Sequence, residues 1–434
     1  MPKAPTAPST PIRRAAILGG NRIPFARSNG PYADASNQDM FVAALDGLVA
    51  RFGLAGETVD EVVGGAVLKH ARDFNLIREC VMSSALSDFT PAYDVQQACD
   101  TGLQAINLVA NKIKLGDIEV GIAGGVDTTS DAPLAVGDPL RRALIKANAA
   151  KSNADRLRAL AGVRPGHIAP EQPRNAEPRT GLSMGEHQAL TTKLWNITRE
   201  AQDELTVRSH QNLGAAYDSG FMDDLVTPFL GLQRDQNLRP DSTMEKLAKL
   251  SPVFGKGEGA TMTAANSTPL SDGASTVLLS SEEWAKKRKL PVLAYLSHVQ
   301  TSAVPYVHGE EGLLMAPAYA VPKLLARAGL TLQDFDYYEI HEAFASQVLS
   351  TLAAWEDADF CKNQLGLKKA LGAIDREKLN VNGSSLAAGH PFAATGGRIV
   401  ATLAKMLHER GSGRGLISIC AAGGQGVVAI VEAA

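Results

Sequence analysis

Short apolar runs alternate with apolar residues at helical spacing along the first part of the chain. Arg14–Gly20 is apolar and ends in a glycine turn, which predicts a buried strand, and Asp39–Phe52 shows helical spacing. Glu61–Leu68 and Ala92–Gln97 are predicted as strands, with a helix over Ala71–Leu86 between them. This alternation predicts an α/β fold.

The two ends of the chain repeat one pattern. A turn that contains Cys99 opens a helix, and a glycine turn then leads into the predicted strand Glu119–Ala123. Near the C-terminus, a turn that contains His390 precedes the predicted helix Thr395–Arg410, and a glycine turn leads into the strand Leu416–Ile419. Two related α/β halves would account for both patterns.

The segment Arg141–Arg179 differs from its surroundings, because Lys and Arg outnumber Asp and Glu by nine to three. Two interpretations stay open. Such charge runs are usually solvated helices and loops, but this one could also be a cap whose positive charge meets the phosphates of a bound nucleotide. The run Glu282–Lys289 is predicted to be a solvated helix.

Length and charge narrow the class of protein. With 434 residues the chain is expected to hold two core units and an insertion. A net charge of −3 argues against nucleic acid or a membrane surface as the main partner, so a small-molecule substrate is favoured. Met1–Pro11 has no signal-peptide pattern and is predicted to be a disordered tail. No apolar run approaches the roughly 18 residues of a membrane span, which predicts a cytoplasmic protein.

The four cysteines, Cys80, Cys99, Cys361 and Cys420, lie far apart and form no C-x-x-C pair. This spacing argues against a disulfide framework and against a zinc site, so no metal is expected. Free thiols in a reducing compartment are therefore available for chemistry.

Cys99 is a candidate nucleophile because it stands between a predicted strand and a predicted helix. Free N–H groups and the positive dipole end of a helix stabilise a thiolate, which predicts a pKa below the usual value of about 8.5. The same N–H groups could hold an oxyanion. A cysteine at such a junction is, however, more often a small buried apolar residue.

Three further residues could support this chemistry. His390, in a Gly-His-Pro turn, could take the thiol proton, although a turn histidine can equally be bonded to backbone. Cys420 ends an apolar strand before a glycine-rich turn and could act as acid and base, or be a buried strand residue. His341 lies between the predicted strand Tyr337–Ile340 and the predicted helix Ala343–Trp355, where it could hold a water or polarise a carbonyl.

Taken together, four stretches resemble the thiolase family: the Cys99 turn, His341-Glu-Ala-Phe, Gly389-His-Pro and Cys420-Ala-Ala-Gly-Gly-Gln-Gly. Each motif is weak alone, but the four in this order are specific, and the resemblance extends over nearly the whole chain. The form of the motifs is most similar to the thiolase component (β) of fatty-acid β-oxidation trifunctional complexes. Biosynthetic acetoacetyl-CoA thiolases more often have asparagine at the position of His341, which favours a degradative role.

The resemblance implies a fold and a domain arrangement. Duplicated α/β halves would form a layered α-β-α-β-α core with an inserted loop domain. The N-terminal half would comprise 12–140 and 255–285, the loop domain that binds coenzyme A and the acyl chain 141–254, and the C-terminal half 286–434, after the tail over 1–11.

The resemblance also implies a reaction, that of an acetyl-CoA C-acyltransferase (3-ketoacyl-CoA thiolase). Cys99 would attack the keto carbonyl of a 3-oxoacyl-CoA with His390 as base, and Cys420 would protonate the acetyl-CoA enolate that leaves. Coenzyme A, a co-substrate rather than a permanently bound cofactor, would then remove the shortened acyl group. Ping-pong kinetics follow from such an acyl-enzyme.

Two oxyanion holes are implied for this reaction. One consists of His390 with a water held by His341, and the other of the backbone N–H groups of Cys99 and Ala422. Residue 422 is often glycine in the family, a difference of little consequence because only its N–H is needed.

Substrate-binding residues are implied in the same way. Met184 would line the acyl pocket, while Arg239 and Thr268 would contact coenzyme A. Threonine stands at 268 where the family usually has serine.

Alternative functions stay open at this point. They are an acetyl-CoA acetyltransferase that forms acetoacetyl-CoA, a decarboxylating ketosynthase, and a lipid-binding protein without catalysis. Cys99, His341 and His390 could imitate the ketosynthase triad, but that enzyme has no use for Cys420. The family further implies a homodimer or homotetramer, and a hydratase/dehydrogenase α subunit is a candidate partner.

Overall fold

The computed structural model describes residues 12–434 except 256 and 258, so the predicted tail over 1–11 lies outside the described residues. A ten-stranded mixed sheet runs through the molecule. Its strands, in spatial order, are β12 (Tyr337–Ile340), β13 (Arg414–Ala421), β14 (Gln425–Ala433), β11 (Ala294–Ala303), β1 (Ala16–Arg22), β10 (Ser271–Ser280), β5 (Val120–Asp127), β3 (Glu61–Gly64) and β4 (Ala92–Asp94), with β2 (Ala26–Arg27) beside β10.

The sheet consists of two halves with the same topology. In the N-terminal half the order is β1-β10-β5-β3, and in the C-terminal half it is β11-β14-β13-β12, so each chain segment fills the same place in its half. The first strands of the two halves join them, because β1 and β11 pair antiparallel over two positions. The sequence repeat therefore reflects a duplicated fold.

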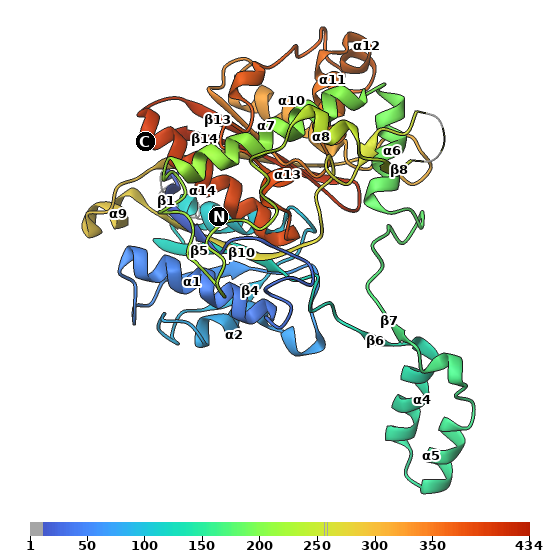
Figure 1. The fold of residues 1–434 in the computed structure, drawn as a ribbon. Helices are drawn as coiled ribbons and strands as arrows, with labels where there is room; N and C mark the ends of the chain where they lie inside the picture. The colour runs from blue at the N-terminus through green and yellow to red at the C-terminus, as the bar shows by residue number, and fades with distance from the viewer. Residues whose placement is uncertain (1–11, 256, 258) are drawn as a thin grey trace, which may run out of the picture.

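Helices form three layers around the two half-sheets (Figure 1). The central layer holds α3 (Thr101–Leu115) and α14 (Thr395–Arg410), whose apolar residues form one core with strands of both halves. On the outer face of the N-terminal half lie α1 (Asn37–Phe52) and α2 (Leu76–Met82). On the outer face of the C-terminal half lie α10 (Ala316–Ala328) and α11 (Ala345–Glu356). The predicted α-β-α-β-α fold class is confirmed.

Two predicted elements are shorter than the sequence indicated. The strand expected over Glu61–Leu68 ends at Gly64, because the N–H groups of Val67 and Leu68 bond to the Asp127 carboxylate and not to a neighbouring strand. The predicted strand Ala92–Gln97 likewise ends at Asp94, before the Cys99 turn.

The helix predicted over Ala71–Leu86 is also wrong in its extent. It divides into a 3-10 turn, η1 (Ala71–Asp73), and the helix α2. The break follows from local bonding, since the Asp73 carboxylate accepts the N–H of His70 and Asn75 leaves the helical conformation with φ −132° and ψ 57°.

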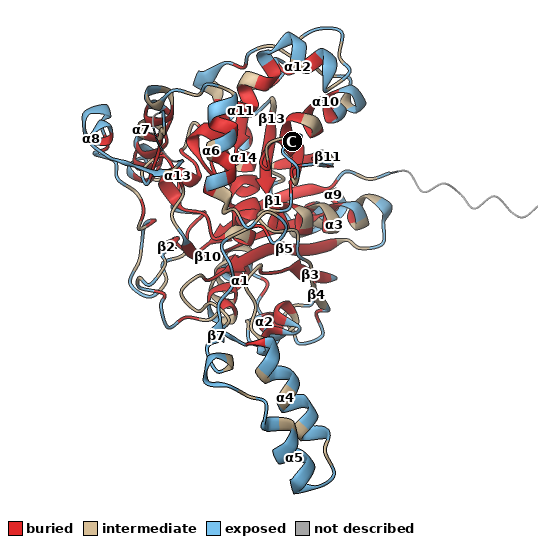
Figure 2. Ribbon diagram, turned by 90° about the vertical axis from the view of Figure 1, so that its right-hand side faces the viewer, coloured by how far each residue is buried: buried red, intermediate tan, exposed pale blue. Residues whose placement is uncertain are grey.

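The basic segment Arg141–Arg179, called the excursion below, forms most of a helical hairpin that projects from the body (Figure 1). It contains α4 (Asp138–Ala149) and α5 (Asn153–Leu160), and neither helix has a buried residue, as the pale blue colour in Figure 2 shows. The strands β6 (Ala135–Val136) and β7 (Pro170–Glu171) pair at its base, with η2 (Pro165–His167) preceding β7. The basic residues of these two helices thus lie on a solvated surface, and their contact with the phosphates of a bound nucleotide stays a prediction.

The fold contains further helices and short strands. They are α6 (Met184–Leu194), α7 (Arg199–Asp218), α8 (Met244–Ala248), β8 (Pro252–Phe254), β9 (Met262–Thr263), α9 (Glu282–Arg288), α12 (Ala358–Asn363), η3 (Arg376–Lys378), α13 (Ser385–Ala388) and η4 (Phe392–Ala394). The largely exposed α9 is the solvated helix predicted from its charge run.

Among the described residues, no helix combines the length and apolarity that crossing a membrane requires. The domain boundaries expected from the sequence, 12–140 with 255–285, 141–254 and 286–434, stay a prediction.

Candidate active site

Cys99 lies in a strained turn between β4 and α3. Ala98, just before it, has φ 47°, a left-handed value that is uncommon for a residue other than glycine. The Thr101 hydroxyl holds this turn, because it accepts the N–H of Gln97 at 2.9 Å and donates to the carbonyl of Ala98 at 2.7 Å. The turn leaves the Cys99 thiol half-buried at the start of α3.

The structure brings His390 to Cys99 across the two halves. Its Nε2 lies 3.0 Å from the Cys99 Sγ, and its Nδ1 lies 2.6 Å from the hydroxyl oxygen of Thr395. The turn requires glycine at 389, where φ is 101° and a Cβ would come within 2.6 Å of the Asn237 side chain. The imidazole is thus fixed at both nitrogens, one of them facing the candidate nucleophile.

Close backbone contact makes this approach possible. A Cβ on Gly102, in the first turn of α3, would lie 2.5 Å from the carbonyl oxygen of Ala393. One on Gly125, in β5, would lie 2.1 Å from the same oxygen. These two glycines let η4, which follows His390, press against the element that carries Cys99.

Cys420 and Ala422 reach the same place from the end of β13. The N–H of Ala422 bonds to the Cys99 thiol, and Cys420, two residues earlier, is 1 % exposed. The Gln97 side chain donates to that of Gln425 at 3.1 Å, which ties the Cys99 turn to the start of β14. The two thiols lie close enough for Cys99 to raise the pKa of Cys420, while their catalytic roles stay a prediction.

The pKa of Cys99 departs from the sequence-based expectation. Burial and the charge of Asp100 raise the pKa of the Cys99 thiol to about 12, against the opposing effect of the N–H groups of Ala422 and of Cys99 itself. The prediction of a lowered pKa was wrong for the free protein, because burial of the thiol, with Asp100 beside it, outweighs the effect of the helix N-terminus.

His390 is correspondingly neutral. Burial and the positive charge of Arg398 lower the pKa of His390 to about 3. A protonated thiol beside a neutral imidazole is therefore the resting state, with the Cys99 S–H donating to Nε2. Such a pair transfers its proton as the sulfur attacks.

His341 lies directly beside His390. The two ring centroids are 4.1 Å apart with an interplanar angle of 45°. The Nδ1 of His341 contacts the Ser385 hydroxyl at 2.7 Å, while its Nε2 is buried and has no partner among the described residues. Burial, His390 and Arg398 all lower the pKa of His341, so this ring is also neutral.

A cavity of about 1380 Å³ reaches Cys99 and Ala422, with the buried His390, His341 and Cys420 behind its lining. Its wall combines residues from both halves with the segment that follows β7, 172–178. The lining includes Val67, Leu68, Gln97, Cys99, Gln104, Leu108, Met184, Leu270, Phe392, Ala422 and Gln425. Of the predicted substrate-binding residues, Met184 therefore lies in the cavity wall.

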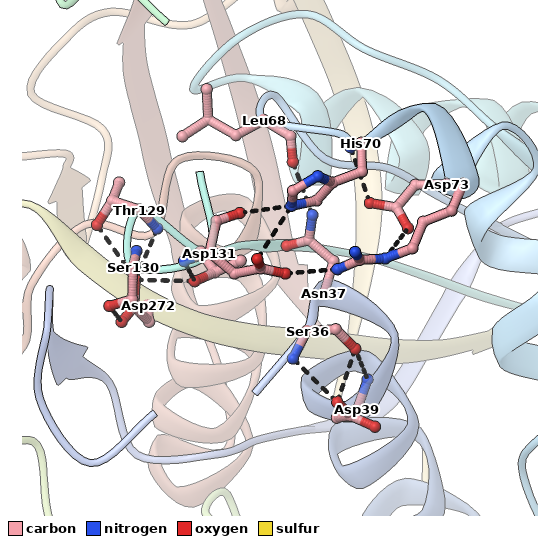
Figure 3. A network of polar contacts seen from close by, with 12 residues as sticks. Ser36, Asn37, Asp39, Leu68, His70, Asp73, Thr129, Ser130, Asp131 and Asp272 are labelled. Atoms are coloured by element: carbon pink, nitrogen blue, oxygen red, sulfur yellow. Dashed lines mark hydrogen bonds and ion pairs between the residues drawn. The ribbon is translucent and has the colours of Figure 1, made fainter. Parts of the chain in front are cut away.

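A polar network fixes the cavity wall where the excursion begins (Figure 3). The Asp272 carboxylate accepts the N–H of Thr129 at 2.7 Å and the N–H of Ser130 at 3.2 Å. Asp131 is held by His70, whose Nε2 lies 2.9 Å from its carbonyl oxygen and 3.1 Å from its carboxylate. Thr129 and Ser130 are thereby held in the lining of the cavity.

Arg239 and Thr268 lie outside the cavity lining. Arg239 is exposed in the loop between α7 and α8, and its Nη1 donates to the carbonyl of Leu238 at 2.7 Å. The Thr268 hydroxyl donates to the carbonyl of Ala343 at 3.0 Å. Their contact with coenzyme A stays a prediction.

Two groups of site residues were missed by the sequence analysis. Asp127 ends β5 and accepts the N–H groups of Val67, Leu68 and Ala393, which links the cavity wall to the His390 turn. Its position as a polar residue at a strand end was a usable signal. Ser385 and Arg398, which contact each other at 2.9 Å, gave none, because nothing in the sequence pattern shows that they reach His341.

No group of three or more His, Cys, Asp or Glu side chains with the arrangement of a metal site occurs within the described ranges. The chemistry proposed for this site uses thiols, imidazoles and backbone N–H groups.

Comparison with known proteins identifies the family. The thiolase N-terminal domain model matches residues 15–283, and the thiolase C-terminal domain model matches residues 290–433. A 3-ketoacyl-CoA thiolase of Pectobacterium atrosepticum is 41% identical over 425 residues, which cover 96% of this chain and 96% of that protein. A 3-ketoacyl-CoA thiolase of Yersinia pestis (strain Pestoides F) is 40% identical, with coverage of 96% and 97%.

A solved structure supports the same relationship. The acetyl-CoA acetyltransferase of Bacillus anthracis is 31% identical and superposes with a TM-score of 0.81 over 98% of this chain and 100% of that chain. The family predicted from the four motifs is therefore confirmed: the chain belongs to the thiolase family and is an acyltransferase.

Proposed function

We propose that the protein is a 3-ketoacyl-CoA thiolase that cleaves a 3-oxoacyl-CoA with coenzyme A into acetyl-CoA and a shortened acyl-CoA. The 3.0 Å contact between His390 Nε2 and Cys99 Sγ carries the proposal, because it pairs a base with a thiol that lines a large cavity. The relatives at 40% and 41% identity bear the same name.

Acyl transfer to Cys99 is the first half of the reaction. The thiol proton passes to His390 as the sulfur bonds to C3 of the substrate, and the oxyanion on C3 is held by the N–H groups of Cys99 and Ala422. The C2–C3 bond then breaks, leaving the acyl group on Cys99 and its electron pair on the enolate of acetyl-CoA.

Cys420 completes this half by protonating the enolate carbon. Burial and the nearby Cys99 raise the pKa of the Cys420 thiol, so it is protonated when the carbanion forms. Acetyl-CoA leaves, and Cys420 is left as a thiolate beside a protonated His390.

Coenzyme A carries out the second half. Its thiol gives a proton to the Cys420 thiolate, and the resulting CoA thiolate attacks the acyl-Cys99 thioester. Cys99 leaves as a thiolate and takes back its proton from His390, which restores the resting enzyme. Coenzyme A is thus a co-substrate, and the cycle needs no permanently bound cofactor.

The cavity favours a degradative role in fatty-acid β-oxidation. Its volume of about 1380 Å³ includes apolar wall residues such as Val67, Leu108 and Met184, which suit an acyl chain longer than acetyl. The second candidate is an acetyl-CoA acetyltransferase that forms acetoacetyl-CoA, which the likeness to the Bacillus anthracis enzyme favours. Both reactions use one site in opposite directions.

Thiolysis of 3-oxoacyl-CoA substrates of graded length tests the proposal. We expect Cys99→Ser to form no acyl-enzyme and Cys420→Ser to lose turnover. Cys80→Ala is the matched control, since Cys80 is a buried free thiol that packs with the outer core of α1 and α2. Activity on acetoacetyl-CoA alone would favour the acetyltransferase, and no thiolysis of any length would contradict both.

The two rival classes are separated by simpler assays. A decarboxylating ketosynthase would condense malonyl groups from an acyl carrier protein, and the buried Cys420 would be dispensable. A lipid-binding protein without catalysis would give no burst of acyl-enzyme when mixed with substrate.

Assembly and location complete the proposal. A homodimer or homotetramer is supported by β4, which ends the sheet, and by Phe74 and Phe89, which are 93% and 88% exposed. A hydratase/dehydrogenase α subunit is the proposed partner of the projecting α4–α5 hairpin, where Leu157 is 70% exposed. Light scattering of the chain, alone and with such a subunit, tests both, and cell fractionation tests the cytoplasmic location.

A further inference from the structure

His341 presents an unusual hydrogen-bonding problem. Its ring is fully buried, its Nδ1 lies 2.7 Å from the Ser385 hydroxyl, and its Nε2 has no partner in the part of the chain that the structure describes. A neutral imidazole carries one proton, so one nitrogen donates and the other accepts. Which nitrogen holds the proton decides whether His341 offers the site a donor or an acceptor.

Arg398 constrains the answer through Ser385. Its Nη2 lies 2.9 Å from the Ser385 hydroxyl oxygen and 3.2 Å from that of Ser384. A guanidinium only donates, so the Ser385 oxygen accepts from Arg398. Arg398 is 4 % exposed in α14, where burial lowers the pKa of its guanidinium and the neighbouring Glu339 of β12 opposes that effect.

The Ser385 proton then has one acceptor. Among the described residues this hydroxyl forms hydrogen bonds only with Arg398 and with the Nδ1 of His341. Since Arg398 cannot accept, the hydroxyl donates to Nδ1, and Nδ1 must be unprotonated. The proton of the neutral ring is left on Nε2, the nitrogen without a partner.

We infer that Arg398 and Ser385 are positioning residues that hold His341 with its proton on Nε2, so that its N–H donates to the water predicted beside His390 in the oxyanion hole of the substrate's thioester oxygen. The inference rests on the proposed function. The His390 ring, whose centroid lies 4.1 Å from that of His341, takes the opposite arrangement, because its Nε2 must accept the Cys99 proton while Nδ1 faces Thr395. The two adjacent rings therefore have different roles imposed by different hydroxyl groups.

Because this donor serves the thioester oxygen, only the reaction step in which that oxygen becomes negative depends on it. The thioester oxygen becomes negative only when the acetyl-CoA enolate forms, that is, during C2–C3 cleavage. Transfer of the acyl group between Cys99 and coenzyme A forms no enolate and uses the N–H groups of Cys99 and Ala422. Loss of the donor should thus slow cleavage and leave acyl exchange intact.

Ser385→Ala tests the inference by comparing two reactions of the full chain. Thiolysis of a 3-oxoacyl-CoA should fall about 100-fold through kcat, as for loss of one oxyanion donor. Exchange of labelled coenzyme A into a saturated acyl-CoA should stay within about twofold of wild type. Ser350→Ala is the matched control, because its buried hydroxyl has no partner among described residues, and Ser385→Thr should restore thiolysis.

Equal losses in thiolysis and exchange would overturn the inference, as would unchanged thiolysis in Ser385→Ala. If wild type performs neither reaction, the proposed function itself fails, which is a distinct outcome. Nitrogen-15 NMR of histidine-labelled wild type, with His341→Asn to assign the signal, provides a measurement that does not depend on folding of the Ser385 variant. A proton on Nε2 supports the inference, and a proton on Nδ1 overturns it.

Discussion

Gly396 of α14 lies against Leu103 of α3 so closely that a Cβ on Gly396 would come within 2.2 Å of the Leu103 backbone nitrogen. The two helices belong to different halves of the duplicated fold, and their first turns follow His390 and Cys99 respectively. The distance between base and nucleophile is therefore set by how closely two backbones can approach.

Gly396→Ala should separate these helices. The added methyl group meets backbone atoms, which cannot move as a flexible side chain can, so we expect a loss of about 1–3 kcal/mol in the free energy of unfolding. The kcat of thiolysis should fall by more than the loss of folded protein explains, because the contact between His390 and Cys99 lengthens. Urea unfolding and kcat measure the two effects. Gly162→Ala is the control, since a Cβ there meets nothing within 4 Å, and equal effects in both variants would contradict the prediction.

The neutral resting pair predicts that the reactivity of Cys99 changes with pH without an inflection near neutral pH. Since burial holds the pKa of His390 at about 3 and raises that of Cys99 to about 12, neither group titrates between them in the free enzyme. We expect the rate of alkylation of Cys99 by iodoacetamide to show no inflection near pH 6.5, where an ordinary histidine would titrate. Labelling of Cys99→Ser gives the background rate. An inflection in the rate near pH 6.5 would show an ordinary imidazole instead.

Asp127 predicts a pH dependence of stability. Burial raises the pKa of its carboxyl group to about 7, above the unfolded value of about 3.9. A raised pKa means that the folded state binds the proton more tightly, so the stabilisation is complete below about pH 4 and is lost as the pH rises through about 7. Asp127→Asn lacks this pH dependence of the free energy of unfolding. The difference between wild type and Asp127→Asn therefore isolates the contribution of Asp127, because the other titrating groups are common to both proteins.

The advantage of wild type over Asp127→Asn in unfolding free energy should therefore shrink from about pH 5 to about pH 8. Urea unfolding at both pH values measures it. An advantage that grows with pH would mean that the N–H groups of Leu68, Ala393 and Val67, which stabilise the ionised carboxylate, outweigh burial.

The sequence predicted those helices and strands whose ends depend only on their own apolar pattern. The helix Thr395–Arg410 and the strand Tyr337–Ile340 have the predicted ends, since both are uninterrupted apolar patterns. The strand from Glu61 was extended too far, because its end depends on the Asp127 carboxylate, which is distant in the chain. Apolar periodicity does not show where the backbone N–H groups of a segment stop bonding to a neighbouring strand and bond to a side chain instead.

The sequence predicted those site residues that belong to a motif, and it missed those that reach the site only through packing. Cys99, His390, His341 and Cys420 meet as expected. The direction of the Cys99 pKa was wrong, since the helix N-terminus was visible in the sequence and the burial of the thiol was not.

Arg239 offers the remaining test of coenzyme A binding. Its Nη1 is held by the carbonyl groups of Gln236 and Leu238, which leaves Nε and Nη2 without partners in the described structure and able to bind a phosphate. A hydrogen bond from a charged group contributes about 1.5–3 kcal/mol, so Arg239→Ala should raise KM for coenzyme A roughly tenfold or more at unchanged kcat. Arg234→Ala is the control, because that exposed guanidinium already pairs with Asp218 at 2.7 Å. An unchanged KM would place the phosphates elsewhere, whereas a fall in kcat would mean that Arg239 acts on the Cys99 chemistry rather than on binding.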